Sequence, residues 1–144
     1  MRLVAVFVLV LLALPATALG ASKRDKKGDA PSPSLDLVRV GAARSGGDVL
    51  LRWTFAAAPR GRDVLAAVTP NDYVVVGVKM YGGGKVDAYV FKGGTNRYIR
   101  SYRINGRTVE VVLSSRALGR PRTVKFSSER VGSGPADDGP TIRL

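Results

Sequence analysis

Residues 86–113 read VDAYVFKGGTNRYIRSYRINGRTVEVVL and contain three runs of mostly alternating apolar and polar residues. An alternation of period two is typical of β-strands. Asn105-Gly106 is the strongest short signal for a hairpin turn, and the segment 92–96 (KGGTN) has the composition of a second turn. The stretch therefore predicts three consecutive antiparallel strands, over residues 86–91, 97–104 and 108–113.

The register of these strands determines which side chains share a face, because successive side chains point to opposite sides. A two-residue turn at Asn105-Gly106 would place Tyr102 opposite Val109. A five-residue loop over 92–96 would place Val90 opposite Tyr98. All three strands then agree on one inward apolar face, which holds Val86, Ala88, Val90, Tyr98, Tyr102, Val109, Val111 and Leu113.

Arg100 falls on this inward face in the predicted register. We expect it at a sheet edge, where its head group reaches water, or paired with a carboxylate such as Asp36 or Asp72. The opposite face collects Tyr89 and Phe91 beside two arginines. Exposed aromatic rings beside hydrogen-bond donors bind sugar rings or bases. The predicted ligand-binding residues are therefore Tyr89, Phe91, Arg97, Arg103 and Arg100.

Two alternatives to this site stay open. A four-residue loop between the first two strands would turn Tyr89 and Phe91 inward, since a shift of one residue reverses the faces. The aromatic pair would also be unavailable if a loop or a second sheet covered it.

Short strands and turns continue on both sides of this stretch. The further predicted strands are 35–40, 48–55, 72–80 and 123–129, with a possible turn of helix at 64–68, a loop-like segment at 132–140 and a short final strand at 141–144. This pattern predicts an all-β fold, an antiparallel β-sandwich of about seven to nine short strands of the immunoglobulin-like or jelly-roll-like kind. A closed barrel is the second choice.

The first 20 residues have the features of a secretory signal peptide. Arg2 is followed by an apolar run, Leu3–Leu14, then by Pro15 and small residues. The run is shorter than the roughly 20 residues of a membrane-spanning helix, although an uncleaved anchor is the alternative. Residues 21–34 are rich in charge, Pro and Ser and predict a disordered linker. Residues 35–144 are then the sandwich domain.

Composition restricts the kind of partner. The chain has 23 Lys and Arg, 11 Asp and Glu, and a net charge of +12. A basic surface favours anionic polymers or anionic lipid, although a GC-rich genome would also give many arginines. Cysteine is absent, so an exported chain must fold without disulfides. This suits a bacterial cell surface or medium better than a small disulfide-framed module.

Catalytic and metal-binding motifs are weak. The chain has no His and no Cys, which excludes imidazole catalysis, thiol nucleophiles and zinc sites of the His/Cys kind. We expect no catalytic residues, no metal and no cofactor. One alternative is a Ca²⁺ site in which Asp137 and Asp138 join Asp36 or Asp72 at an edge of the sandwich.

Several segments resemble secreted bacterial β-sandwich modules of the carbohydrate-binding family 9-like and DOMON-like kind. The segments are SLDLVRVGAARSGGDVLLRWTFAAAP (34–59), NDYVVVGV (71–78), NGRTVEVVLSSRALGRP (105–121) and ADDGP (136–140). The resemblance implies a sandwich that binds a sugar or another small ligand. Members that bind haem use Met or His as axial ligands, and here only Met80 is available.

These observations predict a secreted, non-catalytic module that binds carbohydrate or another polymer of the cell envelope. The alternatives are a structural or protein-interaction domain and a sequence-blind electrostatic binder of anionic polymers. The expected partner is an anionic or polysaccharide envelope component or a protein, not a specific nucleic acid. After signal cleavage the chain is not expected to be an integral membrane protein.

Overall fold

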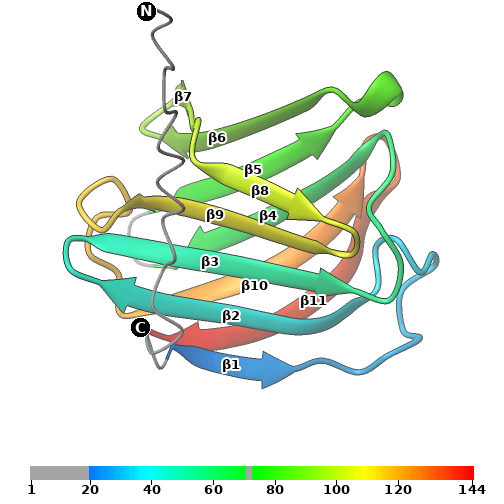
Figure 1. Cartoon of the computed structure of the whole chain (residues 1–144), viewed down its shortest axis with the longest axis horizontal. Helices are drawn as coiled ribbons and strands as arrows, with labels where there is room; N and C mark the ends of the chain where they lie inside the picture. Colours follow the sequence, from blue (N-terminus) through cyan, green and yellow to red (C-terminus); the bar gives the residue numbers. More distant parts are fainter. Residues whose placement is uncertain (1–19, 71–72) are drawn as a thin grey trace, which may run out of the picture.

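The computed structural model describes residues 20–70 and 73–144, and these form eleven strands in two sheets packed face to face (Figure 1). The strands are β1 (Ala21–Arg24), β2 (Leu37–Ser45), β3 (Asp48–Phe55), β4 (Asp63–Thr69), β5 (Val74–Met80), β6 (Val86–Lys92), β7 (Thr95–Tyr98), β8 (Tyr102–Asn105), β9 (Thr108–Ser114), β10 (Thr123–Arg130) and β11 (Gly134–Arg143), with one 3-10 turn, Gly82–Gly84. The predicted signal peptide, apart from Gly20, lies outside the described residues, as does Asp72.

The sheet order confirms the predicted antiparallel β-sandwich. The five-stranded sheet has the order β1-β2-β3-β9-β8, and the six-stranded sheet has the order β11-β10-β4-β5-β6-β7. Each strand pair is antiparallel. Two side edges result. One is formed by β7 and β8, and the other by β1 and β11, as Figure 1 shows at its top and bottom.

The core lies between the sheets and is built from the inward half of each alternating strand. Trp53 of β3 packs edge-on against Phe126 of β10, with ring centroids 5.3 Å apart. The Trp53 indole N–H donates to the carbonyl of Ala66, 3.2 Å away in the opposite sheet. Burial of large aromatic side chains supplies much of the stability of such a core.

Three segments differ from the sequence prediction because main-chain pairing overrides local composition. Residues 64–68 form strand β4 rather than a turn of helix, since β10 and β5 pair with both of its sides. Residues 132–140, predicted as a loop, contribute to β11, which accommodates its Gly and Pro through register shifts against β10. Residues 21–34 were predicted to be a disordered linker, but Ala21–Arg24 pairs with β2 as an edge strand.

The turn between β6 and β7 corrects the predicted register. The turn has two residues, Gly93 and Gly94, with φ values of 56° and 77°. Positive φ at both positions is the requirement of a type I′ turn, which only residues such as Gly satisfy easily. Val90 therefore lies opposite Arg97 rather than Tyr98. Because the slip is one residue, the predicted faces of β7 are exchanged.

The turn between β8 and β9 lies one residue later than predicted, which shifts the strand register by two residues. Asn105 pairs with Thr108, so the turn residues are Gly106 and Arg107, and Tyr102 lies opposite Val111 rather than Val109. Gly106 has a φ of 55° at the first turn position, where type II′ turns have Gly. A shift of two residues leaves the faces unchanged, so Tyr102 keeps its predicted side.

The predicted strand 97–104 is two strands in two different sheets. β7 ends at Tyr98, and the chain crosses at residues 99–101 to begin β8 beside β9. The Ile99 N–H still donates to the carbonyl of Ala88 at 2.7 Å, whereas the Ser101 carbonyl accepts from the N–H of Val112 at 2.9 Å. This crossover connects the open edges of both sheets.

The crossover also corrects the predicted burial of three side chains. Arg100 lies in the crossover and is exposed, so it is neither inward nor paired with Asp36. Tyr98 lies on the outer face and is 74% exposed, and Tyr102 on edge strand β8 is 39% exposed. An edge strand has a neighbour on one side only, so its inward side chains stay partly accessible.

Candidate ligand-binding site

Three aromatic side chains from the β6–β7 hairpin share the outer face of the six-stranded sheet. Tyr89 lies directly opposite Tyr98, and Phe91 is the next outward residue of β6. Phe91 is 39% exposed and Tyr98 is 74% exposed, whereas Tyr89 is half-buried. We call Tyr89, Phe91 and Tyr98 the aromatic patch.

A glycine positions the most buried ring of the aromatic patch. Gly77 of β5 lies opposite Tyr89, and a Cβ at this position would collide with the Tyr89 ring. The ring therefore lies over the Gly77 backbone, and its burial raises the pKa of the Tyr89 phenol, with a further contribution from the charge of Glu129. Val75, opposite Phe91, extends the apolar surface beside the patch.

The other side of the same hairpin opens into a groove between the two sheets. Its volume is about 590 Å³, within the range of small-ligand sites. The apolar part of its lining comes mainly from β6, the crossover, β9 and the β9–β10 connection, and the polar part from the hairpin, from Ser114 at the end of β9 and from Arg116. We call this space the cationic groove, and it is lined by Val90, Lys92, Thr95, Arg97, Tyr98, Ile99, Leu113, Ser114, Arg116 and Ala117.

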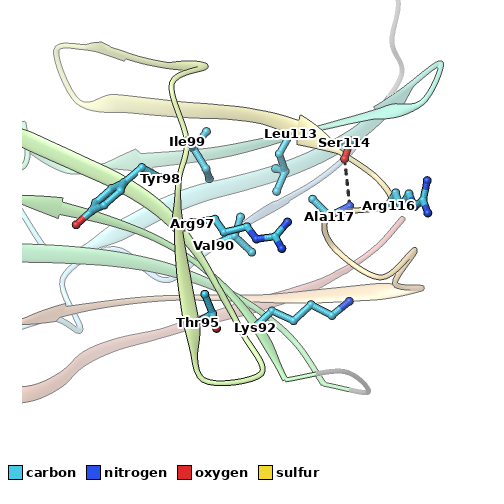
Figure 2. Close-up of a pocket in the computed structure, with 10 residues that line it drawn as sticks. All are labelled: Val90, Lys92, Thr95, Arg97, Tyr98, Ile99, Leu113, Ser114, Arg116 and Ala117. Atoms are coloured by element: carbon cyan, nitrogen blue, oxygen red, sulfur yellow. Dashed lines mark hydrogen bonds between the residues drawn. The ribbon is translucent and has the colours of Figure 1, made fainter.

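Three cations border the cationic groove. Lys92 and Arg97 share the inward side of the hairpin, because the register puts Arg97 opposite Val90 and Lys92 opposite Thr95. Figure 2 shows both side chains extending toward the loop that carries Arg116. Within residues 20–70 and 73–144, none of the three forms a salt bridge. Their positive charge is therefore available to an anion.

The loop that carries Arg116 is held by local hydrogen bonds and one buried anchor. The Ser114 hydroxyl accepts the Ala117 N–H at 3.1 Å, which Figure 2 marks with a dashed line. The side chain of Leu118 is fully buried in the core. Arg44 of β2 donates to the hydroxyl of Ser115 at 2.8 Å from the other side. Such bracing places the loop, and with it Arg116, on the rim of the groove.

The structure separates the five predicted site residues. Tyr89 and Phe91 lie together on the outer face, as predicted. Arg97 is on the opposite side of β7, in the cationic groove, and Arg100 is in the crossover. Arg103 is on β8 of the other sheet.

Arg103 is neutralised where it lies. Its guanidinium donates to Glu110 Oε2 at 2.8 Å, and Arg52 donates to Oε1 of the same carboxylate at 2.7 Å. Burial raises the pKa of Glu110, but the hydrogen bonds from Arg103 and Arg52 outweigh it, and the net pKa is lowered. Arg103 is therefore a less suitable ligand-binding residue than Arg97.

Sequence reasoning missed Tyr98, Lys92 and Arg116. The first two depend on the two-residue turn, for which the Gly93-Gly94 pair was the available signal. Arg116 lies in a connection whose path depends on tertiary contacts, and no local pattern predicts its place beside Arg97.

No family model, curated protein or solved structure matches this chain. The resemblance to carbohydrate-binding family 9-like and DOMON-like modules therefore stays a prediction. In the described part of the chain, no helix has the length and apolar character needed to span a membrane.

Proposed function

We propose that this protein is a secreted, non-catalytic binding module for an acidic carbohydrate polymer of the cell envelope. One observation carries the proposal: a single hairpin presents the aromatic patch on one side and the cationic groove on the other. Tyr98 and Arg97 are neighbours in sequence and point to opposite faces of β7. A polymer that crosses this edge can therefore contact rings and cations together.

The two surfaces suit two parts of an acidic sugar. The apolar face of a sugar ring stacks on an exposed aromatic ring such as that of Phe91 or Tyr98. The planar guanidinium groups of Arg97 and Arg116 match carboxylate or phosphate oxygens, and Lys92 adds a compact positive charge. The apolar floor of the groove reduces competition from water at these contacts.

The exposure of the site favours a polymer over a small enclosed ligand. Tyr98 and Phe91 lie on an open sheet face, and the cationic groove opens at the side of the sandwich. A long chain can place successive residues on both surfaces and gain affinity from several weak contacts. Localisation outside the cell rests on the signal-like sequence of residues 1–20.

Binding to polygalacturonate, compared with neutral dextran, tests the proposal. We expect the wild-type protein to bind polygalacturonate and not dextran in affinity electrophoresis. Tyr98→Ala should weaken binding about fivefold through lost stacking. Arg97→Ala combined with Arg116→Ala should weaken it by about tenfold or more at low salt.

Arg103→Ala is the matched control, because Arg103 is an exposed arginine on the opposite sheet that already pairs with Glu110. Binding by this variant should equal wild type. Equal loss from Arg103→Ala and Arg97→Ala, together with no loss from Tyr98→Ala and equal binding of DNA, would replace the proposal with sequence-blind electrostatic binding. Absence of binding to any anionic polymer would favour a protein partner.

A further inference from the structure

Four aspartates meet at the other side edge of the sandwich. Asp25, Asp29 and Asp36 come from the β1–β2 segment, and Asp137 comes from β11. Carboxylate oxygens of Asp29, Asp36 and Asp137 all lie within 4.8 Å of one another. The fourth, Asp25, approaches β11 closely, because its Oδ2 lies 3.4 Å from the place that a Cβ would take at Gly139. Four of the chain's 11 acidic residues thus gather in one place.

Backbone N–H groups occupy one oxygen of three of these carboxylates. Asp25 Oδ1 accepts from Lys26 at 2.9 Å, Asp36 Oδ2 accepts from Gly28 at 2.8 Å, and Asp137 Oδ2 accepts from Leu37 at 2.7 Å. These hydrogen bonds fix the orientation of each carboxylate and leave its second oxygen available.

Two of the remaining oxygens are buried without any hydrogen-bond donor. They are Oδ2 of Asp25 and Oδ1 of Asp36. Asp36 is only 3% exposed and Asp137 only 7% exposed, so water does not compensate these charges. Buried polar atoms are normally paired, and an unpaired buried carboxylate oxygen is costly. The unsatisfied oxygen of the buried Asp36, within the cluster, points to a site for a cation.

Among the residues that the structure describes, no side chain supplies a positive charge to this cluster. Lys26 and Lys27 are exposed, and none of the four aspartates forms a salt bridge within the described ranges 20–70 and 73–144. The pKa of Asp137 is raised to about 6, mainly by burial and further by the charges of Asp25, Asp29 and Asp36, against the opposing hydrogen bond from Leu37.

We propose that Asp29, Asp36 and Asp137 bind a Ca²⁺ ion, with Asp25 as an additional or outer ligand. Calcium takes six to eight oxygen ligands at about 2.3–2.6 Å, so two oxygens on the same ion are at most about 5 Å apart. The spacing of the three carboxylates meets this limit. Magnesium requires a smaller, near-octahedral site and retains several waters, which suits a cluster of three or four carboxylates less well.

Such an ion would fasten the β1–β2 segment to β11. The hydrogen bond from Leu37 to Asp137 already joins residues 100 positions apart, and a cation would add a charge-neutralising bridge at the same place. This site lies at the β1–β11 edge and is independent of the binding surface on the β6–β7 hairpin.

Calcium titration of the chelator-treated protein tests the site. We expect heat of binding in isothermal titration calorimetry, with a Kd between about 10 µM and 1 mM, as in extracellular calcium modules and weaker sensors. Saturating CaCl₂ should raise Tm by about 5 °C relative to EDTA. Asp29→Asn should weaken Ca²⁺ binding about tenfold or more, and this exposed residue is unlike Asp36 in that its replacement disturbs no buried group.

Asp138→Asn is the matched control. Asp138 is adjacent to Asp137 but is exposed and pairs with Lys125, so the variant should bind Ca²⁺ like wild type. The proposal is overturned if wild type shows neither heat nor a Tm change up to about 10 mM CaCl₂, or if Asp29→Asn responds as wild type does. An equal Tm response to MgCl₂, or to NaCl at matched ionic strength, would overturn the assignment to calcium.

Discussion

The two side edges of the sandwich carry unpaired charges of opposite sign and in different environments. The β7–β8 edge has Lys92 and Arg97 beside Arg116, and these cations face an open groove. The β1–β11 edge has buried aspartates, including Asp36 and Asp137. Water screens an exposed charge at little cost, whereas a buried charge needs a partner. The first edge is therefore suited to reversible binding of anions, and the second to binding of the proposed cation, which would add stability.

The buried Asp63 provides a reference for the β1–β11 edge, which we call the acidic edge, because this aspartate forms an ion pair with an arginine. Its Oδ1 accepts from Arg130 Nε at 3.0 Å and from Nη2 at 2.9 Å, and Asp63 is fully buried. Arg130→Met should lower the free energy of unfolding by about 3 kcal/mol, because it leaves a buried charge unpaired. Urea unfolding measures the loss. Adding Asp63→Asn should recover part of it, and a loss below about 1 kcal/mol would contradict this explanation.

Asp137→Asn tests whether repulsion and burial of charge destabilise the acidic edge when no cation is bound. In EDTA, removal of one buried charge from the cluster should raise the free energy of unfolding by about 1 kcal/mol. The amide oxygen can still accept the N–H of Leu37. In saturating CaCl₂ the order should reverse, since the variant loses a ligand. Thermal unfolding in both buffers gives the comparison. Lower stability of the variant in EDTA would show that the charge of Asp137 does not destabilise the folded protein.

Glu110 pairs with two cations, Arg52 and Arg103. Replacing Glu110 should change the stability less than the two changes above, because both arginines are exposed. The net pKa of Glu110 is lowered below its ordinary value of 4.5, so its contribution is present above about pH 4.5 and declines as the pH falls through the folded-state pKa. Glu110→Gln should cost about 0.5 kcal/mol at pH 7 and less near pH 3. Urea unfolding at both pH values measures this cost. A larger loss of stability near pH 3 than at pH 7 would contradict the prediction.

Arg97→Ala should have the smallest effect on stability. The side chain of Arg97 is exposed and borders an open groove, so its removal should change the free energy of unfolding by less than about 0.5 kcal/mol. Binding of polygalacturonate should nevertheless fall. Parallel urea and binding measurements separate the two effects. A stability change above about 1 kcal/mol would mean that this edge, like the acidic one, has a structural role.

Regular alternation allowed the fold class to be predicted from the sequence. Leu51, Trp53 and Phe55 alternate with polar or exposed residues and are fully buried, as period two requires. The face of the sheet on which each side chain lies was harder to predict, because it depends on the length of the turn before the strand. One residue of error at Gly93-Gly94 exchanged the faces of Arg97 and Tyr98, and with them the composition of the binding site.

The residues that meet at the two edges could not be predicted from local sequence patterns, and the reason differs between the edges. The crossover at residues 99–101 has no turn signal, so the chain there looked like the middle of one strand. The acidic edge depends on Asp29 and Asp137, which are far apart in sequence, and residues 21–34 have the composition of a linker. A calcium site with Asp36 and Asp137 was a possible alternative, but no spacing rule could bring Asp25 and Asp29 to it.

The hydrogen bond between Leu37 and Asp137 has a consequence for the order of folding. Closing a loop of 100 residues costs roughly 4 kcal/mol of chain entropy before any contact compensates it. Sandwiches with many distant pairings fold slowly for this reason. We expect the β1–β11 edge to close last and to open first, with the Leu37 amide among the early exchanging groups of the buried backbone. An ion held there would act mainly on the rate of opening.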